Sequence, residues 1–215
     1  MIIDDEAVLW SAAGEDRADR PLLVLLHGYN SNEGDLFGLA PYLPLQPVIA
    51  SLRAPLDAGY GYAWFEVFDE RGRIDDDSPA KQAESQAAAE AVLAWVDRAA
   101  PGTPVGLVGF SQGGALCLEL LRLAPERFEF AAILAGFAMP GERDGDARLA
   151  TVRPPVFWGR GTLDEVIPAA SVARTQDWLP GHATVDARIY EGLGHSVSEA
   201  ELADLTGFLR DRYAA

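Results

Sequence analysis

The chain has 215 residues, of which 49% are hydrophobic and 23% charged, and its formal net charge is −16. This length and composition predict a single globular domain spanning residues 1–215, and no run of about 18 apolar residues suggests membrane insertion. The negative charge disfavours nucleic acid and anionic lipid as partners, and the acidic start MIIDDEAVLW does not resemble a secretory signal, so we expect a cytoplasmic protein.

Short apolar runs along the chain predict β-strands that are buried on both faces. They are rich in Val, Ile and Leu and do not alternate with polar residues, which is typical of a parallel sheet covered by helices. In chain order these runs are Pro21–His27, Val48–Leu52, Val105–Phe110, Phe130–Ala135, Pro155–Trp158 and Thr184–Tyr190.

Helical patterns separate these strands. A long helix is expected over Pro79–Ala99, with Ser78 as its N-cap and proline at its first position. The last helix should open with a capping box between Ser198 and Glu201. The leucines expected to point inward are Leu116, Leu120 and Leu123 in the helix after residue 111, and Leu202, Leu205 and Leu209 in the last helix. This alternation predicts an α/β fold whose ligands bind beyond the carboxyl ends of the strands.

The sequence gives no sign of a metal or an organic cofactor. The three histidines are scattered, and Cys117 is the only cysteine, so no ligand cluster forms. We expect Cys117 to be a small buried hydrophobe, the alternative being a reactive thiol. The acidic run Asp75, Asp76 and Asp77 could suggest a hard-metal site, but consecutive carboxylates point in different directions and favour a solvated loop.

The segment from Gly109 to Gly113 reads Gly-Phe-Ser-Gln-Gly and predicts a nucleophile elbow centred on Ser111. In such an elbow a tight strand-to-helix turn projects the serine hydroxyl above the sheet, and the flanking glycines let strand and helix approach closely. The pattern follows the apolar strand VGLVGF and precedes the helix-like GGALCLELLRL, which is the context this motif requires.

A serine nucleophile needs a base, and the sequence offers three histidines. His27 ends an early strand, and His182 is expected in a polar turn before the last strand. His195 follows the last strand and precedes the last helix, which suits the chain order serine, acid, histidine. We therefore predict His195 as the base, the alternative being a loop histidine without a role.

The third group should accept a hydrogen bond from the imidazole and stabilise the imidazolium. Asp164 lies in the loop just beyond the strand PVFW, and Glu165 beside it is its rival. Asp177 is expected in a helix and Asp186 within a strand. We prefer Asp164 to Glu165, partly because of the resemblance described below.

Acyl transfer also needs two donors directed at the developing oxyanion. The backbone N–H of Gln112, directly after the serine, should be one of them. The other should come from the loop that follows the strand LLVLLH and starts His27-Gly28, where we predict the backbone N–H of Tyr29. The alternative for the His-Gly pair is a plain turn that ends the strand.

These motifs together resemble the phospholipase/carboxylesterase family of α/β-hydrolases, which includes bacterial carboxylesterases and acyl-protein thioesterases. The resemblance implies a single α/β-hydrolase domain without a large cap domain, a Ser111–His195–Asp164 triad, and oxyanion donors at Tyr29 and Gln112. Matching segments run through nearly the whole chain: LLHGYNSNEGDLFGLAPYL, SLRAPLDAGYGYAWFEV, GLVGFSQGGALCLELL, WGRGTLDEVIP and YEGLGHSVSEAELADL.

The chain departs from this family at Asn30, where many relatives have glycine. Trp64 and Phe65 resemble a Trp-Phe pair of the family, so we expect them near the substrate, the alternative being aromatic side chains packed in the core. Apolar residues between positions 56 and 68 suggest a homodimer contact.

The expected function is hydrolysis of a small-molecule ester or thioester by a carboxylesterase, with lysophospholipase or thioesterase activity as variants. Two other functions stay open at the level of sequence. One is an acyltransferase that uses the same triad, and the other is a catalytically silent hydrolase fold that acts as a binding protein.

Overall fold

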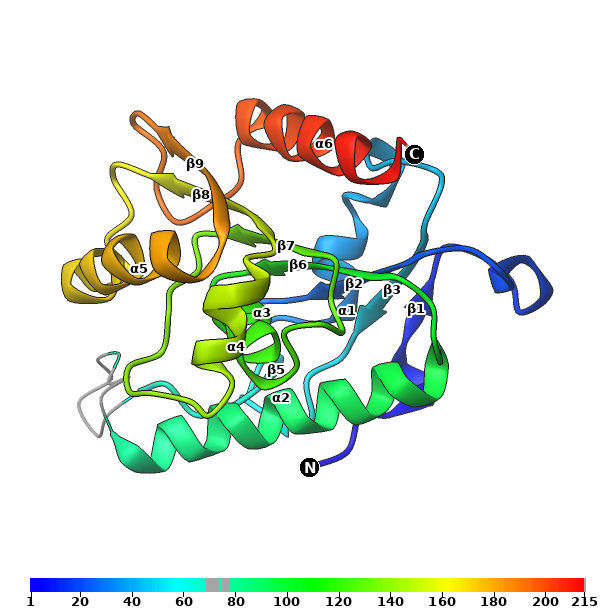
Figure 1. The fold of residues 1–215 in the computed structure, drawn as a ribbon, viewed down its shortest axis with the longest axis horizontal. Helices are drawn as coiled ribbons and strands as arrows, with labels where there is room; N and C mark the ends of the chain where they lie inside the picture. The colour runs from blue at the N-terminus through cyan, green and yellow to red at the C-terminus, as the bar shows by residue number, and fades with distance from the viewer. Residues whose placement is uncertain (69–73, 75–77, 215) are drawn as a thin grey trace.

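A seven-stranded, mostly parallel sheet forms the centre of the molecule (Figure 1). The structure, a computed structural model, describes residues 1–68, 74 and 78–214. The sheet order is β1-β3-β2-β6-β7-β8-β9, and within the described part of this sheet only the pairing of β1 with β3 is antiparallel. The strands are β1 (Leu9–Trp10), β2 (Leu22–Leu26), β3 (Val48–Leu52), β6 (Val105–Phe110), β7 (Phe130–Leu134), β8 (Pro155–Gly161) and β9 (Thr184–Tyr190).

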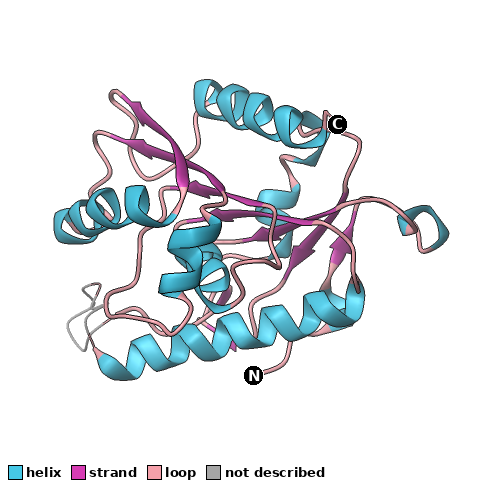
Figure 2. Cartoon of the chain, in the orientation of Figure 1, coloured by secondary structure: helices cyan, strands magenta, loops and turns pink. Residues whose placement is uncertain are grey.

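Helices cover both faces of this sheet (Figure 2). On one face lie α2 (Pro79–Ala99), α3 (Gln112–Leu123), α4 (Asp146–Val152) and α5 (Ala169–His182), and on the other lie α1 (Glu33–Phe37) and α6 (Glu199–Tyr213). The short 3-10 turns are η1 (Asp5–Ala7), η2 (Glu15–Arg17) and η3 (Ala40–Tyr42), and β4 (Leu56–Asp57) pairs with β5 (Tyr62–Ala63). The predicted α/β-hydrolase architecture is confirmed, and no cap domain interrupts the described part of the chain.

Strand β2 shows why its sequence is apolar throughout. Successive side chains point to opposite faces of a strand. Leu22, Val24 and Leu26 therefore enter the larger core cluster, with side chains of α2 and α3. Leu23 and Leu25 enter the smaller cluster, with side chains of α1 and α6. Because helices cover both faces of β2, neither face carries polar side chains.

Helix α3 crosses the middle of the molecule and is almost entirely buried. Leu116 and Leu120 are inaccessible, as predicted, but Leu123 is 42% exposed because it is the last residue of the helix, where the chain reaches the surface. Cys117 is fully buried, and burial raises the pKa of its thiol, so the expected small hydrophobe is confirmed.

Two predicted helix starts differ in detail from the structure. Ser78 does precede α2, with proline at the first position, but its side chain makes no capping hydrogen bond. At α6 the hydroxyl of Ser198 accepts a hydrogen bond from the backbone N–H of Glu201 at 3.1 Å, which is half of a capping box. The carboxylate of Glu201 does not complete the box, because it is buried inside the fold with neither oxygen bonded.

His182 was predicted in a turn, but it is the last residue of α5. Its Nδ1 donates to the carbonyl of Trp178, at 2.8 Å, and its ring stacks on the Trp178 indole at a centroid distance of 4.1 Å. The sequence Pro180-Gly181 suggested an earlier helix end, yet the last turn persists because His182 satisfies one of its free carbonyl groups.

Some sequence predictions lie beyond what the structure tests. The acidic run at positions 75–77 is outside the described residues. Within the described residues, no helix is long and apolar enough to cross a membrane, and no three side chains of His, Cys, Asp or Glu gather as metal ligands. That one domain spans all of residues 1–215 stays a prediction.

Candidate active site

Ser111 lies between the end of β6 and the start of α3, in the centre of the sheet's carboxyl edge. Its backbone has φ 53° and ψ −114°, a conformation that is strained for any residue other than glycine. The strain persists because the turn is fixed from both sides: the backbone N–H of Ser111 donates to Leu134 at the end of β7, at 2.8 Å, and the next residue begins α3. This turn directs the hydroxyl away from the sheet.

The glycines of the Ser111 turn are required by close backbone contacts. A Cβ at Gly113 would lie 1.9 Å from the carbonyl oxygen of Leu26 in β2, and a Cβ at Gly109 would lie 2.2 Å from the carbonyl oxygen of Gly113. Both distances are far below van der Waals contact, so neither position accepts a larger residue. The predicted elbow geometry is therefore present.

The structure brings Ser111, His195 and Asp164 together at one edge of the sheet. His195 Nε2 lies 2.9 Å from the Ser111 hydroxyl, and His195 Nδ1 lies 2.8 Å from Asp164 Oδ2. The tautomer that fits both contacts has its proton on Nδ1, so that Nδ1–H donates to the carboxylate and Nε2 accepts from the hydroxyl. This chain of hydrogen bonds could transfer a proton from Ser111 to His195.

Asp164 is held by more than the imidazole. Its second oxygen, Oδ1, accepts the backbone N–H groups of Val166 and Ile167 at 2.9 and 3.2 Å. These bonds orient the carboxylate, whose side chain is only 7% exposed. Its rival Glu165 is exposed to solvent and makes no such contact in the described chain.

Two other acidic residues are far from this arrangement in the fold. Asp177 lies on the exposed face of α5. Asp186 lies within β9, where it pairs with Arg188 at 2.7 Å. Both positions match what the sequence suggested.

The loop after β2 lies directly against Ser111. A Cβ at Gly28 would lie 3.1 Å from the Phe110 ring and 3.5 Å from Ser111 Cβ, so a larger residue would press on the ring beside the serine. The next residue is Tyr29, whose backbone N–H makes no hydrogen bond within the described chain. The backbone N–H of Gln112, at the first position of α3, is likewise without a partner there. Free donors beside a buried hydroxyl are what an oxyanion site requires.

Asn30 stands where the family resemblance led us to expect a glycine, and its backbone conformation is one that glycine favours. Its φ is 57°, in the left-handed region that glycine adopts freely and asparagine adopts more readily than most residues. Its side-chain oxygen accepts the backbone N–H of Tyr60 at 3.1 Å, which ties the loop to the segment between β4 and β5.

Trp64 joins the two backbone segments that carry the free N–H groups. Its indole N–H donates to the carbonyl of His27, at 2.8 Å, and its backbone N–H donates to the side chain of Gln112, at 3.0 Å. The Gln112 amide in turn donates to the carbonyl of Phe65, at 2.5 Å. We call these contacts the Trp64 clamp.

Trp64 and Phe65 are both inaccessible to solvent and belong to the larger core cluster. This burial matches the alternative interpretation, aromatic side chains packed in the core. Contact with substrate stays a prediction for both residues, and in this structure neither side chain faces an open space.

His27 is the buried end of the same arrangement. Its Nδ1 lies 2.7 Å from the carbonyl oxygen of Gly28, and its Nε2 accepts the backbone N–H of Ala54 at 3.1 Å. With both nitrogens bonded in this way the ring is neutral, and burial lowers its pKa. His27 therefore fixes the loop that leads to Tyr29 and has no free nitrogen for proton transfer.

Sequence reasoning missed the Trp64 clamp and the role of His27. Nothing in the spacing of residues 27, 64 and 112 indicates that they meet. The available signal was the Trp-Phe pair itself, whose position between two motifs could suggest a structural link.

A family described as Phospholipase/Carboxylesterase matches residues 11–212. The chain is 26% identical to acyl-protein thioesterase 1 of Kluyveromyces lactis, over 92% of this chain and 94% of that protein. It is 25% identical to acyl-protein thioesterase 1 of Saccharomyces cerevisiae, over 69% of this chain and 67% of that protein.

Solved structures show the same fold. A carboxylesterase from Mesorhizobium loti superposes with a TM-score of 0.78 and 24% identity, covering 97% of each chain. At this sequence identity the structural similarity establishes the fold alone. The chemistry has to be inferred from the residues of the site.

Proposed function

The chain belongs to the phospholipase/carboxylesterase family of α/β-hydrolases, and from this premise we propose that it cleaves carboxylic esters or thioesters with Ser111 as nucleophile, His195 as base and Asp164 as the orienting acid. The single observation that carries the assignment is the pair of contacts of His195, 2.9 Å to the serine hydroxyl and 2.8 Å to the carboxylate. Serine, imidazole and carboxylate in this order form the arrangement that activates a hydroxyl for acyl transfer.

In the first step Ser111 attacks the carbonyl carbon of the substrate while His195 Nε2 takes the hydroxyl proton. Asp164 stabilises the imidazolium that forms, because its carboxylate accepts the Nδ1–H throughout. The negative charge that develops on the carbonyl oxygen is bound by the backbone N–H groups of Tyr29 and Gln112. The tetrahedral intermediate collapses to an acyl-enzyme, and His195 returns the proton to the leaving alcohol or thiol.

In the second step water attacks the acyl-enzyme, with His195 again as base. The same two backbone donors bind the second oxyanion, and the acid is released as Ser111 regains its proton. Each step uses only groups that this chain supplies.

Substitution of Ser111 tests the assignment directly. We expect Ser111→Ala to lower kcat/KM for p-nitrophenyl butyrate by about 10⁴-fold or more, because the nucleophile is absent while the fold is retained. An organophosphonate should label the wild type once, at Ser111. The control is Ser85→Ala, a buried serine of α2 whose hydroxyl bonds within its own helix. Turnover by Ser111→Ala at the wild-type rate would remove Ser111 from the mechanism.

Hydrolysis and acyl transfer use the same residues and differ in the acceptor. Relatives of this chain are named as a thioesterase and a probable carboxylesterase, which supports hydrolysis rather than acyl transfer. Product analysis with a competing alcohol separates the two, since a transferase would form the new ester at alcohol concentrations where water remains in large excess.

Other expectations from the sequence remain proposals. The homodimer would use the segment Leu56–Phe68, where Leu56 is 37% exposed and Tyr60 fully exposed. Sedimentation of the wild type and of Tyr60→Ser would test it. The cytoplasmic location is a further proposal, which rests on the sequence alone.

A further inference from the structure

A groove of about 500 Å³ opens beside Asp164 at the carboxyl edge of the sheet. We call it the Asp164 groove. Its walls come from the loop after β7, from the end of β8 and from α5, and they include Gly136, Arg160, Thr162, Asp164, Val172 and Gln176. The loop after β7 starts one residue beyond Leu134, whose carbonyl accepts the backbone N–H of Ser111. The groove therefore lies beside Asp164 and next to the strand end that holds the backbone of Ser111, although Ser111 itself does not line it.

Arg160 is the one cation among the described residues that line this groove. It is half-buried near the end of β8, on the same face of the strand as Trp158, and its guanidinium carbon lies 5.7 Å from the Trp158 ring centroid. The Trp158 indole is itself fixed by donating to the carbonyl of Gly136 at 3.1 Å. The guanidinium of Arg160 therefore lies over an aromatic ring that is fixed in position.

The guanidinium lacks the partners that a half-buried cation normally has. Its Nε is buried and bonds to no atom in the described chain. The nearest buried carboxylate of the groove, Asp164, is already engaged by His195 and by two backbone N–H groups. A buried polar group without a partner in a native fold calls for an explanation such as a ligand.

From these observations we propose that the Asp164 groove binds a carboxylate carried by the acyl or alcohol part of the substrate, through Arg160. The proposal rests on the proposed esterase function and names its substrate class: anionic esters or thioesters. The Nε–H and one Nη–H of a guanidinium point the same way and match the two oxygens of a carboxylate. A neutral ester can occupy the groove without satisfying them.

The same groove also contains two carboxylates, Asp164 and Glu165, of which Asp164 is already bonded to His195 and to two backbone N–H groups. Glu165 lines it and is exposed to solvent. Its carboxylate repels an incoming anion, although water and salt screen it more than they screen the half-buried Arg160. Arg160 should therefore favour the binding of anionic substrates, and Glu165 should disfavour it.

The test compares matched substrates rather than absolute rates. One pair is p-nitrophenyl hemiadipate and its neutral methyl ester, which places the carboxylate on the acyl side. The second pair is 4-carboxyphenyl butyrate and its methyl ester, which places it on the leaving group. For each variant the measured quantity is the ratio of kcat/KM for the anionic ester to kcat/KM for its neutral partner.

We expect Arg160→Met to lower this ratio about tenfold or more in at least one pair, which is the discrimination given by charge-assisted hydrogen bonds. Arg160→Lys should lower it less, because charge is kept and the fork is lost. Glu165→Gln should raise the ratio. Arg148→Met removes the same charge from an exposed position on α4 and should leave the ratio unchanged.

Two outcomes would overturn the proposal. One is a ratio for Arg160→Met equal to that of the wild type in both pairs. The other is an equal loss of activity toward anionic and neutral esters with a lower melting temperature, which would make Arg160 a structural residue. Failure of the esterase assignment itself is distinguishable, because it would appear as retained turnover in Ser111→Ala with the neutral esters.

Discussion

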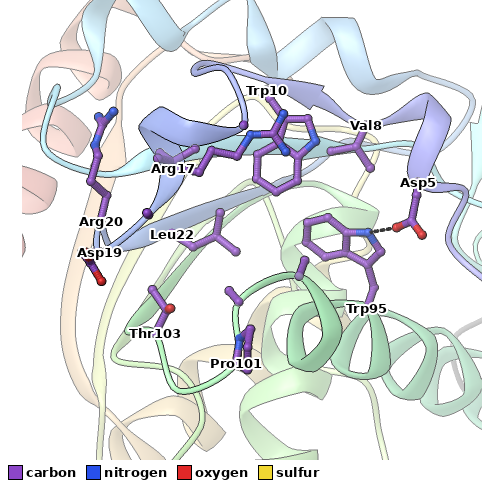
Figure 3. Close-up of a pocket in the computed structure, with 15 residues that line it drawn as sticks. Asp5, Val8, Trp10, Arg17, Asp19, Arg20, Leu22, Trp95, Pro101 and Thr103 are labelled. Atoms are coloured by element: carbon purple, nitrogen blue, oxygen red, sulfur yellow. Dashed lines mark hydrogen bonds between the residues drawn. The ribbon is translucent and has the colours of Figure 1, made fainter.

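Cavities of similar size open at the two opposite edges of the sheet. At the carboxyl edge lies the Asp164 groove, of about 500 Å³, and at the amino edge of β2 and β3 lies a cavity of about 560 Å³. Figure 3 shows the amino-edge cavity, with Arg17 stacked on Trp10 and the indole of Trp95 bonded to Asp5. Its polar groups are largely used: Arg17 also donates to the carbonyl of Ala12, at 3.0 Å.

The carboxyl edge differs from the cavity of Figure 3 in having polar groups without partners in the described chain. The backbone N–H groups of Tyr29 and Gln112 are free within the described chain, and Nε of Arg160 is buried and unbonded. Ser111 is held in a strained conformation at the same edge. The comparison shows that volume does not identify a site, whereas strain and unsatisfied groups that converge on one space do. Substitutions at the two edges should therefore have very different effects.

The largest effect expected beyond the nucleophile is that of Asp164→Asn. The amide N–H of asparagine donates a hydrogen bond where the carboxylate accepted one, which disfavours the Nδ1–H tautomer of His195. We therefore expect kcat/KM to fall by about 10³- to 10⁴-fold. Steady-state ester hydrolysis measures it. Asp177→Asn on the exposed face of α5 is the matched control and should match the wild type. Full activity in Asp164→Asn would leave His195 without its proposed acid.

The second effect concerns stability and comes from Glu201, in the first turn of α6 against Gly159 of β8. Burial, with a smaller contribution from Asp204, raises the pKa of its carboxyl from 4.5 to about 7. Because the folded-state pKa lies above the unfolded value, the stabilising contribution of protonated Glu201 is fully present below about pH 4.5. It is lost as the pH rises through about 7, and the free energy of unfolding falls by roughly 3 kcal/mol. Glu201→Gln cannot ionise, so it should not show this decline.

Urea unfolding at about pH 5 and about pH 8 measures the Glu201 effect. The stability of Glu201→Gln relative to the wild type should increase between these two values. Glu199→Gln, an exposed neighbour in the same first turn of α6, serves as the control. Parallel curves for all three proteins would show that Glu201 ionises normally in the fold.

Trp64→Phe should have a smaller effect on catalysis. It keeps the aromatic ring but removes the indole N–H that holds the carbonyl of His27. Displacement of the Tyr29 donor by a fraction of an ångström should lower kcat/KM about tenfold. A boronic acid that mimics the oxyanion should lose affinity in parallel, with KM for substrate little changed.

Trp95→Phe is the matched control for the Trp64 clamp. It also removes one buried indole hydrogen bond, to Asp5, but at the amino edge. It should lower stability without changing kcat/KM or boronic acid affinity. Equal behaviour of the two variants would mean that the clamp is only structural.

The smallest effect is expected for Arg17→Met, in the amino-edge cavity. The change removes a cation over the Trp10 ring at 3.8 Å, worth about 0.5 to 1 kcal/mol of stability at a partly exposed site. Ester hydrolysis should remain within about twofold of the wild type, because no catalytic charge is near. A large loss of activity would show that the two edges are coupled.

The sequence predicted the parts of the molecule whose determinants are local. Val48–Leu52, Val105–Phe110 and Thr184–Tyr190 have the strand bounds expected, and Pro79–Ala99 has the helix bounds expected. The order of the motifs along the chain favoured His195 over His27, and the hydrogen bonds of His195 involve the expected partners, while its role as base stays a prediction.

The sequence could not predict contacts between distant segments. The burial of Glu201 and of Trp64 depends on the residues that pack against them. The residues next to them in the sequence do not indicate these contacts. Glu201 fits a capping box by pattern, yet the space left by Gly159 admits its carboxyl group into the fold: a Cβ at Gly159 would lie 2.1 Å from Glu201 Oε1. The short strands β4 and β5 also escaped prediction, because two residues are too few for a period.

The sheet order has a consequence for how activity arises during folding. Ser111 and His195 are separated by 84 residues in the chain, and the loop of His195 follows β9, the outermost strand of the parallel array. A nascent chain that has completed β6 and α3 therefore contains the proposed nucleophile but not the proposed base. Long-range parallel pairing forms slowly compared with local contacts. Esterase activity should thus be the last property gained, and a partly synthesised chain stays inert toward the esters around it.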